Sequence, residues 1–488
     1  MSTPAPLRLS AAAAGLVCAA LLGTAGASHA DGAGPAPQRT QGAAQAGAKA
    51  AAAESPTGRA AAFDQVTRLA RRHGTVTVTI ILAEAPTRAP DAGVRSRLTD
   101  QASAGRAAAL RALDGPTGTS SVPGAPAMTA TVDAADLAAL RREPAVLSIA
   151  RNIDFRAAGT TTFGIQDGVQ LPRWWHLKKM GLDWTYAHGY NGAGQRIVVV
   201  DSGVDYTHPW LQGHVVDGAC FSSDGCGNGL FYAYGIQAGK NCTYAVSCAH
   251  GTHVAQTAAG KYGAARSAGI VAINASHRSA SGRPTYGTAD LINALWYSYY
   301  YVSPAPAAVN LSIGGSTTYA TTCDSTNQPL ADWITALRSR GTATVIAAGN
   351  SNSSTGVSYP ACMSRAVVVG NATLTSATGR PAVLGGRAGA SNSNRLVDLW
   401  APGTDICSAV PTSLDVDGTR DGADCSWYGT SMAAPQVSGA FAVLKAARPS
   451  YSVNQSLSAF VRNGLAITDS RNGVTRSMVN VANAVYYG

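Results

Sequence analysis

Three short segments carry side chains that together could perform nucleophilic catalysis. Asp201 opens the segment DSGVD, His250 opens HGTHVA, and Ser431 is the third residue of GTSMAAP. A serine hydroxyl becomes a good nucleophile only beside a base, and a carboxylate can hold an imidazole base in the required tautomer. The three segments therefore supply a nucleophile, a base and an acid for acyl-transfer chemistry.

The pattern of the chain from about residue 160 predicts the scaffold that positions these residues. Short, almost purely apolar runs alternate with helical stretches, which is typical of a doubly wound parallel α/β sheet. The runs are 197–200, 270–273, 307–311, 344–348 and 366–369, and the helical stretches are 291–297, 330–338 and 432–447. Sites in such sheets lie at the carboxyl ends of strands, where Asp201 and Asn350 are expected.

The order Asp, His, Ser and the local sequences around these residues resemble the subtilisin-like serine proteases, the subtilase family. The resemblance extends over nearly all of residues 60–488. It implies a subtilisin-like parallel sheet with helices on both faces, and a serine endopeptidase that works through an acyl-enzyme. By this resemblance, Ser431 is the nucleophile, His250 the general base and Asp201 the orienting carboxylate.

Two further segments resemble the substrate-binding parts of the family. The sequence AAGN at 347–350 is similar to the oxyanion loop, so Asn350 would donate its side-chain amide beside the backbone N–H of Ser431. The sequence VNLSIGG at 309–315 is similar to the strand that lines the primary specificity pocket, and residues 281–287 would flank the opposite side. We expect an extended substrate to pair as an added strand.

The substrate-binding residues implied by this resemblance are Ser312, Gly314 and Gly349. Neither cleft segment contains an acidic residue, so a preference for basic side chains is not indicated. We expect apolar or aromatic residues before the cleaved bond.

A second imidazole and a second carboxylate lie close to the first pair. His253 is three residues after His250, but Gly251 stands where a zinc protease would have its glutamate. We therefore interpret His253 as structural and packed against the sheet, and Asp205 as a turn residue.

The sequence departs from the family at three places. Gln256 stands where the motif usually continues with Gly, so helix packing near the base is expected to differ. Trp210 stands where many members carry a calcium-binding aspartate, and residues 260–270 lack the usual calcium loop. We predict that this calcium site is absent, and that no metal or other cofactor is required.

Residues 1–30 are interpreted as a signal peptide, because Arg8 precedes an apolar stretch at 11–22 and a small-x-small site ends at Ala30. Residues 31–58, rich in Ala, Gly, Pro and Gln, are interpreted as a flexible linker. We expect a secreted, extracellular protein.

Eight cysteines remain after the signal peptide, and an even number in an exported chain indicates disulfides. Eight cysteines allow about 105 connectivities, so the pairing stays open. Pairing of sequence neighbours would give 220–226, 242–248, 323–362 and 407–425. A zinc site is disfavoured because there is no Cys-x-x-Cys.

Residues 59–156 show an α/β alternation of their own. Strands are expected at 76–80, half-buried on one face, and at 128–132 and 146–149, with a helix at 91–113 and a short helix capped by Asp133 and ended by Pro144. The pattern resembles the inhibitory propeptide of subtilases. It implies an intramolecular chaperone and inhibitor, a catalytic domain at 157–488, and self-cleavage within 152–170.

Composition excludes several other classes. Only 13% of the 488 residues are charged, and the net charge of +10 is not concentrated in a basic run with aromatics. We therefore expect no nucleic-acid partner and no membrane partner. The resemblance to subtilases implies a monomer that acts on protein or peptide substrates. Two alternatives remain: a non-catalytic binding protein on the same scaffold, and a peptide ligase. A neutral to mildly alkaline optimum is expected, since His250 must be unprotonated to act as a base.

Overall fold

The protein is described from a computed structural model. It divides into two units, Met1–Lys49 and Ala50–Gly488, and all described residues belong to the second. These residues are 56–86, 92–113, 117–158, 160–161, 174–374, 381–383, 390–415 and 422–488. The expected signal peptide and most of the expected linker lie outside them.

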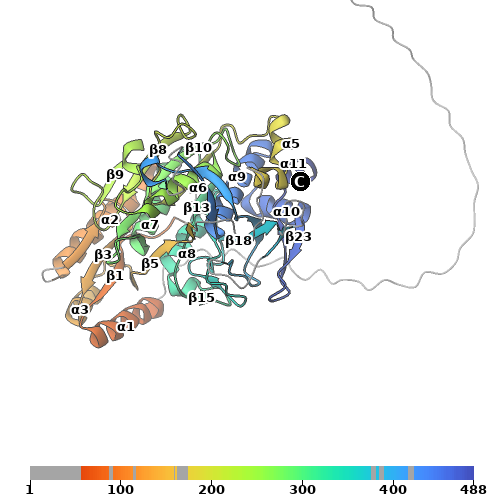
Figure 1. Ribbon diagram of the computed structural model, residues 1–488. Helices are drawn as coiled ribbons and strands as arrows, with labels where there is room; N and C mark the ends of the chain where they lie inside the picture. Colours follow the sequence, from red (N-terminus) through yellow and green to blue (C-terminus); the bar gives the residue numbers. More distant parts are fainter. Residues whose placement is uncertain are drawn as a thin grey trace, which may run out of the picture. The chain divides into compact units, whose positions relative to one another are not determined.

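The N-terminal part of the second unit is a small antiparallel sheet with helices. The strands follow the order β2-β3-β1-β4, and the helices are α1, α2 and α3 (Figure 1). The elements are α1 Pro56–His73, β1 Val76–Ile81, α2 Ala92–Ala112, β2 Thr117–Ser121, β3 Ala127–Val132, α3 Ala134–Arg142 and β4 Ser148–Arg151. Asp133 caps α3 in a capping box, as expected.

Helix α1 was not predicted, and it begins at Pro56 inside the segment interpreted as a linker. Its buried residues Phe63, Val66 and Ala70 follow a helical spacing, and they pack on the sheet beside Ile80 and Leu137. The signal was present in the sequence, but the surrounding alanines made it weak.

The prediction that β1 is half-buried on one face holds at Thr77, which is exposed, and fails at Thr79. Thr79 is buried as fully as Ile80, because the second face of the sheet is covered too. Helix α7, Thr288–Tyr300, lies against that face, and the side chain of Asn293 pairs with the backbone N–H and carbonyl of Ala127 at 3.3 and 3.2 Å. A sheet of this kind needs a partner on its open face, and the larger domain supplies one.

The larger domain is built on a mainly parallel sheet with strand order β23-β24-β20-β18-β16-β13-β7-β10-β8-β9. Its strands are β7 Arg196–Asp201, β8 Val215–Phe221, β9 Tyr232–Tyr234, β10 Gly269–Asn274, β13 Ala308–Leu311, β16 Ala343–Ala347, β18 Val367–Leu374, β20 Leu399–Pro402, β23 Leu465–Thr468 and β24 Thr475–Met478. Only the outermost pairs, β8 with β9 and β23 with β24, are antiparallel along this order. The five predicted strands are confirmed.

Helices cover both faces of this sheet, as the fold class predicted (Figure 1). Helices α6, His250–Ala258, and α9, Thr430–Ala447, share a core with Ile197 and Val199 of β7. Helices α7 and α8, Gln328–Ser339, share the opposite core with Val198 and Val200. Alternate residues of β7 thus pack into two separate cores, one on each face of the sheet.

The remaining helices are α4 Trp175–Lys179, α5 Leu182–Ala187, α10 Val453–Asn463 and α11 Val481–Tyr487. No helix within the described ranges combines the length and the apolar character that a bilayer crossing requires.

Four disulfides join sequence neighbours, so the pairing written above as one possibility is confirmed. They are Cys220–Cys226, Cys242–Cys248, Cys323–Cys362 and Cys407–Cys425. Cys242–Cys248 closes the turn directly before His250. Cys407–Cys425 joins strands β21, Ile406–Ala409, and β22, Ala423–Tyr428, of which β22 leads into the segment of Ser431.

Candidate active site

Strand β7 ends at Asp201 and helix α6 begins at His250, and the two side chains meet. The imidazole Nδ1 of His250 lies 2.8 Å from Oδ1 and 3.0 Å from Oδ2 of Asp201, with both residues buried. Asp201 Oδ1 also accepts hydrogen bonds from the backbone N–H of Ser202 at 2.7 Å and the hydroxyl of Tyr286 at 3.2 Å. An imidazole held at Nδ1 by a carboxylate keeps Nε2 available as a base.

Ser431 is the second residue of α9, and its hydroxyl does not complete this chain of hydrogen bonds. Ser431 Oγ donates to the carbonyl oxygen of Ser312 at 2.8 Å. Nε2 of His250 is buried without a hydrogen-bond partner among the described residues. The structure therefore joins the candidate acid to the candidate base, while the hydroxyl of the candidate nucleophile points to the backbone of Ser312.

The two expected oxyanion donors converge on one oxygen atom. The backbone N–H of Ser431 donates to the carbonyl oxygen of Ala158 at 2.9 Å, and Nδ2 of Asn350 donates to the same oxygen. Asn350 Oδ1 in turn accepts from the N–H and the hydroxyl of Thr430 at 3.0 and 2.9 Å. These contacts orient the amide so that its N–H₂ group faces Ala158.

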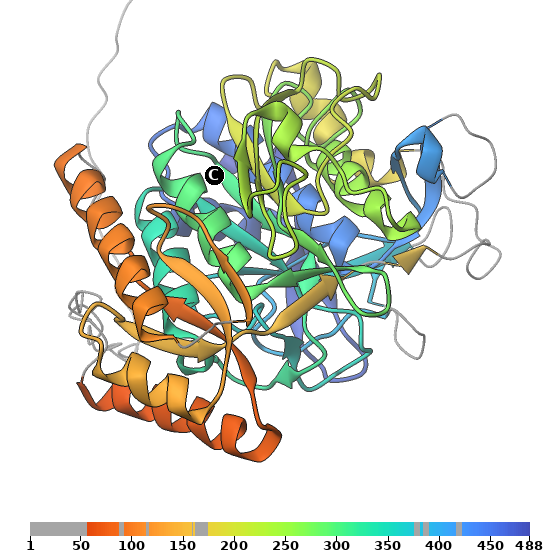
Figure 2. The ribbon, with the colours of Figure 1, turned by 90° about the vertical axis from the view of Figure 1, so that its left-hand side faces the viewer.

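Ala158 follows an extended segment that lies between the two expected cleft walls. Strand β5, Asp154–Ala157, pairs antiparallel with β14, Ile313–Gly314, on one edge and with β12, Pro284–Gly287, on the other. The N–H of Ala158 donates to Ser312 O at 2.9 Å. Figure 2 shows the segment from the side of the N-terminal domain. No motif in the sequence pointed to β5, and only its place before the larger domain could have done so.

Two of the predicted substrate-binding residues, Ser312 and Gly314, lie beside this segment. The position of a Cβ on Gly314 would lie 4.0 Å from the Cβ of Ala158 and 3.3 Å from that of Ser358. Gly349 has a φ of +99°, and a side chain there would overlap Ser358. Only glycine fits at position 349, because its φ is positive and Ser358 leaves no room for a side chain.

Phe155 anchors the segment further from Ala158. Its ring is fully buried and stacks on Tyr359, with ring centroids 5.3 Å apart, and its backbone pairs with Tyr286. Phe155 and Tyr359 were not singled out from the sequence, because their contact joins residues about two hundred positions apart.

The interpretations of the neighbouring polar residues are confirmed. His253 stacks on Trp427 at 4.7 Å between ring centroids, and its Nε2 lies 3.0 Å from the carbonyl oxygen of Ile406. Asp205 Oδ1 accepts from the N–H and the hydroxyl of Thr207 at 3.1 and 2.6 Å, which forms a turn.

The positions that depart from the family pattern are filled differently. Trp210 packs edge-on against Trp174 and Tyr262, at 5.8 and 5.0 Å between ring centroids. Gln256 is fully buried in α6, and no described residue hydrogen-bonds its amide. Across the part of the chain that the structure describes, no three His, Cys, Asp or Glu side chains gather as metal ligands would.

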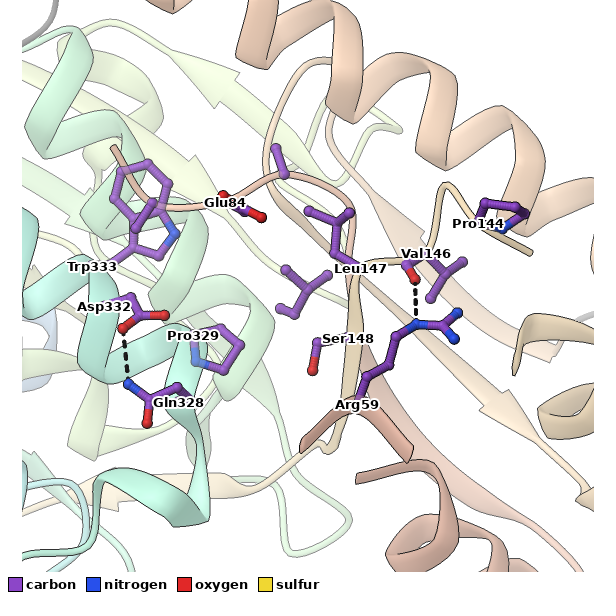
Figure 3. Close-up of a pocket in the computed structure, with 13 residues that line it drawn as sticks. Arg59, Glu84, Pro144, Val146, Leu147, Ser148, Gln328, Pro329, Asp332 and Trp333 are labelled. Carbon is purple, nitrogen blue, oxygen red and sulfur yellow. Dashed lines mark hydrogen bonds between the residues drawn. The ribbon is translucent and has the colours of Figure 1, made fainter. Parts of the chain in front are cut away.

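A cavity of about 240 Å³ lies elsewhere, between the N-terminal domain and α8 (Figure 3). Leu147, Pro329 and Trp333 form apolar walls, and Arg59 and Asp332 lie at its edge. None of the three candidate catalytic residues lines it. It therefore lies at the contact between the two domains and apart from the candidate active site.

Similarity to known proteins identifies the family. The sequence profile of the subtilase family matches residues 192–481, more than half of the chain. The chain belongs to the subtilase family. It is a serine protease of the subtilisin type.

Individual relatives of this subtilase are moderately similar in sequence. The extracellular serine proteinase of Thermus sp. strain Rt41A is 30% identical over 332 residues, which cover 67% of this chain and 68% of the relative. Subtilisin E of Bacillus subtilis strain 168 is 27% identical over 372 residues, covering 74% and 78%.

The subtilisin-like fold is also confirmed by a solved structure. Fervidolysin of Fervidobacterium pennivorans, described as a keratinolytic enzyme related to subtilisin, superposes with a TM-score of 0.59 at 20% identity. The alignment covers 84% of this subtilase and 61% of fervidolysin.

Two buried histidines next to the site predict the acid stability of this subtilase. Burial lowers the pKa of His253 and of His176 to about 3, from an ordinary value of 6.5. Below about pH 6.5 the unfolded chain binds protons that the folded chain excludes, so their contribution to stability is present above pH 6.5 and is lost as the pH falls. In a Ser431→Ala background, which prevents self-digestion, the free energy of unfolding should fall steeply between pH 6 and 4.

Replacing His253 by Gln should lower the slope of that free energy against pH by about 1.4 kcal/mol per pH unit, which corresponds to one proton. Denaturant titrations at a series of pH values measure the slope. The exposed His188, replaced in the same way, serves as the control. An unchanged slope in His253→Gln would contradict the assignment.

Proposed function

We propose that this subtilase is a secreted serine endopeptidase, made as a zymogen that cleaves its own chain between Ala158 and Gly159. The observation that supports the proposal is the carbonyl oxygen of Ala158, held by the N–H of Ser431 and the side-chain amide of Asn350. A segment paired as an added strand, with one carbonyl between two such donors, has the register of a substrate. The relative from Thermus is named an extracellular proteinase, which supports secretion.

Each residue has one role in the proposed reaction. The hydroxyl of Ser431 turns from Ser312 to Nε2 of His250, gives up its proton there, and attacks the carbonyl carbon of Ala158. The oxygen of Ala158 becomes negative, and Asn350 and the N–H of Ser431 stabilise it. His250 then returns the proton to the departing nitrogen of Gly159. Water, activated by the same base, releases the acyl group.

Asp201 and the start of α9 assist without forming bonds to the substrate. Asp201 keeps the proton of His250 on Nδ1 and stabilises the imidazolium. The free N–H groups in the first turn of α9 add partial positive charge beside the oxyanion, because the peptide dipoles of the helix are aligned.

The N-terminal domain is proposed to act as chaperone and inhibitor. Its sheet covers α7 of the larger domain, and β5 stays paired with β12 and β14 on both edges. Cleavage after Ala158 breaks none of these pairings, so the cleaved domain blocks the cleft until it is degraded. The propeptide then ends at Ala158 rather than at Arg156.

Self-processing provides the first test. The wild-type chain, expressed without residues 1–30, should convert to a product that begins at Gly159, whereas Ser431→Ala should stay full length. A denaturing gel, intact mass and N-terminal sequencing measure this. If both chains stay full length, and the wild type neither cleaves peptides nor reacts with a fluorophosphonate probe, the protein is a binding protein and not a protease.

Replacement of Asn350 tests the oxyanion donor. Asn350→Ala removes the amide that faces the carbonyl of Ala158. In subtilisin, loss of the corresponding asparagine lowers turnover by about a hundred- to a thousandfold, and we expect the same range here. Steady-state kinetics should show a lower kcat with little change in KM. A KM effect alone would contradict the role, because a donor to the oxyanion acts in the transition state.

The protein's own sequence before Gly159 predicts the preferred substrate. Phe155, four residues before the bond, is buried against Tyr359, and the small Ala158 precedes the bond. Peptides with Phe at the fourth position before the cut should exceed those with Ala there by roughly ten- to a hundredfold in kcat/KM, since burying a phenyl ring contributes about 1.5–3 kcal/mol. A peptide library measures this. Equal rates would contradict the proposed register.

A further inference from the structure

We infer that Tyr286 is a positioning residue that couples occupation of the substrate strand to the Asp201–His250 pair. The inference rests on the proposed function. It concerns a hydroxyl that forms no bond to substrate and acts through Asp201.

The first observation is the contact with the carboxylate. The hydroxyl of Tyr286 lies 3.2 Å from Oδ1 of Asp201, and both side chains are fully buried. An ionised carboxylate only accepts hydrogen bonds, so the tyrosine must be the donor. Burial and the neighbouring Asp201 raise the pKa of Tyr286 well above its usual range, so the hydroxyl stays protonated at any pH at which the enzyme works.

The second observation is the backbone of the same residue. Tyr286 lies in β12, where it pairs with Phe155 of β5 on one edge and with Ser276 of β11, Ser276–Arg278, on the other. One residue therefore contacts the substrate-like strand through its backbone and the catalytic acid through its side chain.

The two contacts of Tyr286 are coupled because the pairing of β11 with β12 is only marginally stable without a third strand. Strands β11 and β12 have only three paired residues, and a two-stranded pairing of that length is marginal in water. The added strand β5, paired also with β14, makes β12 an inner strand held on both edges. A bound segment that reaches Phe155 therefore restrains Tyr286, and its hydroxyl restrains Asp201.

Loss of the tyrosine hydroxyl is expected to lower kcat. Oδ1 of Asp201 accepts hydrogen bonds from Nδ1 of His250, the N–H of Ser202 and the hydroxyl of Tyr286. Removal of the tyrosine donor leaves the carboxylate less firmly oriented toward His250, which weakens the base in the transition state. The pairing of substrate backbone with β12 remains, so substrate affinity is retained.

The test compares Tyr286→Phe with the wild type on two substrates. One is a tetrapeptide anilide with Phe first and Ala last, which reaches the place of Phe155, and the other is its C-terminal dipeptide anilide. For the tetrapeptide we expect kcat to fall roughly tenfold, the loss typical of a hydrogen bond to a charged group, with KM within about twofold. For the dipeptide, kcat should change by less than about twofold. Titration with a fluorophosphonate corrects for inactive enzyme.

Equal losses of kcat on both substrates, no loss on either, or a change confined to KM would each overturn the coupling. Tyr300→Phe is the matched control, since it also removes a buried hydroxyl, one without a hydrogen-bond partner among the described residues. It should leave both kcat values unchanged.

If Tyr286→Phe matures too poorly for steady-state kinetics, its rate of self-processing provides a second measurement. In the zymogen β5 is always present, so Tyr286→Phe should process its own chain roughly tenfold more slowly than the wild type, and an unchanged rate would overturn the inference. Wild-type cleavage and its dependence on Ser431 test the proposed function separately. The inference itself is tested by comparing Tyr286→Phe with the wild type, in the ratio of the two substrates and in the rate of self-processing.

Discussion

The structure of the site depends on a single hydrogen-bond acceptor, the carbonyl oxygen of Ala158. Two donors from distant parts of the chain, the N–H of Ser431 and the amide of Asn350, converge on it. They converge because α9 packs on β16. The loop that follows β16 therefore meets the first turn of α9. Thr430 completes the arrangement by holding Asn350 in the required orientation.

The same carbonyl lies at the end of a segment that runs from one domain into the other. Residues 148–151 complete the N-terminal sheet, and residues 154–157 enter the larger domain as β5. Asn152 lies between them and accepts a hydrogen bond from the hydroxyl of Thr79, which ties this connection to β1. A short connection of this kind places Ala158 at the donors with little freedom, and the contact of the N-terminal sheet with α7 fixes its starting point.

The surroundings of the acid–base pair are rigid for covalent and packing reasons. Cys242–Cys248 precedes His250, and Cys407–Cys425 joins β21 and β22, which carry the Ile406 and Trp427 contacts of His253. Trp210 packs edge-on against the rings of Trp174 and Tyr262. Disulfides, aromatic packing and two buried histidines of lowered pKa thus occur together in this region.

Sequence alone determined much of the fold. The buried strands of the parallel sheet, the helices between them and the Asp133 cap follow local patterns of apolar periodicity and capping, which act over a few residues. The candidate residues Asp201, His250, Ser431 and Asn350 were identified because each lies in a recognisable segment.

Tertiary structure alone decided the features that join distant segments. The pairing of β5 between β12 and β14, the stacking of Phe155 on Tyr359 and the hydroxyl of Tyr286 at Asp201 have no local signature. The burial of Thr79 and the orientation of the Ser431 hydroxyl toward Ser312 were likewise not predictable. Local propensity specifies which residues form a strand, whereas the neighbour across each edge and face is set by how the whole chain packs.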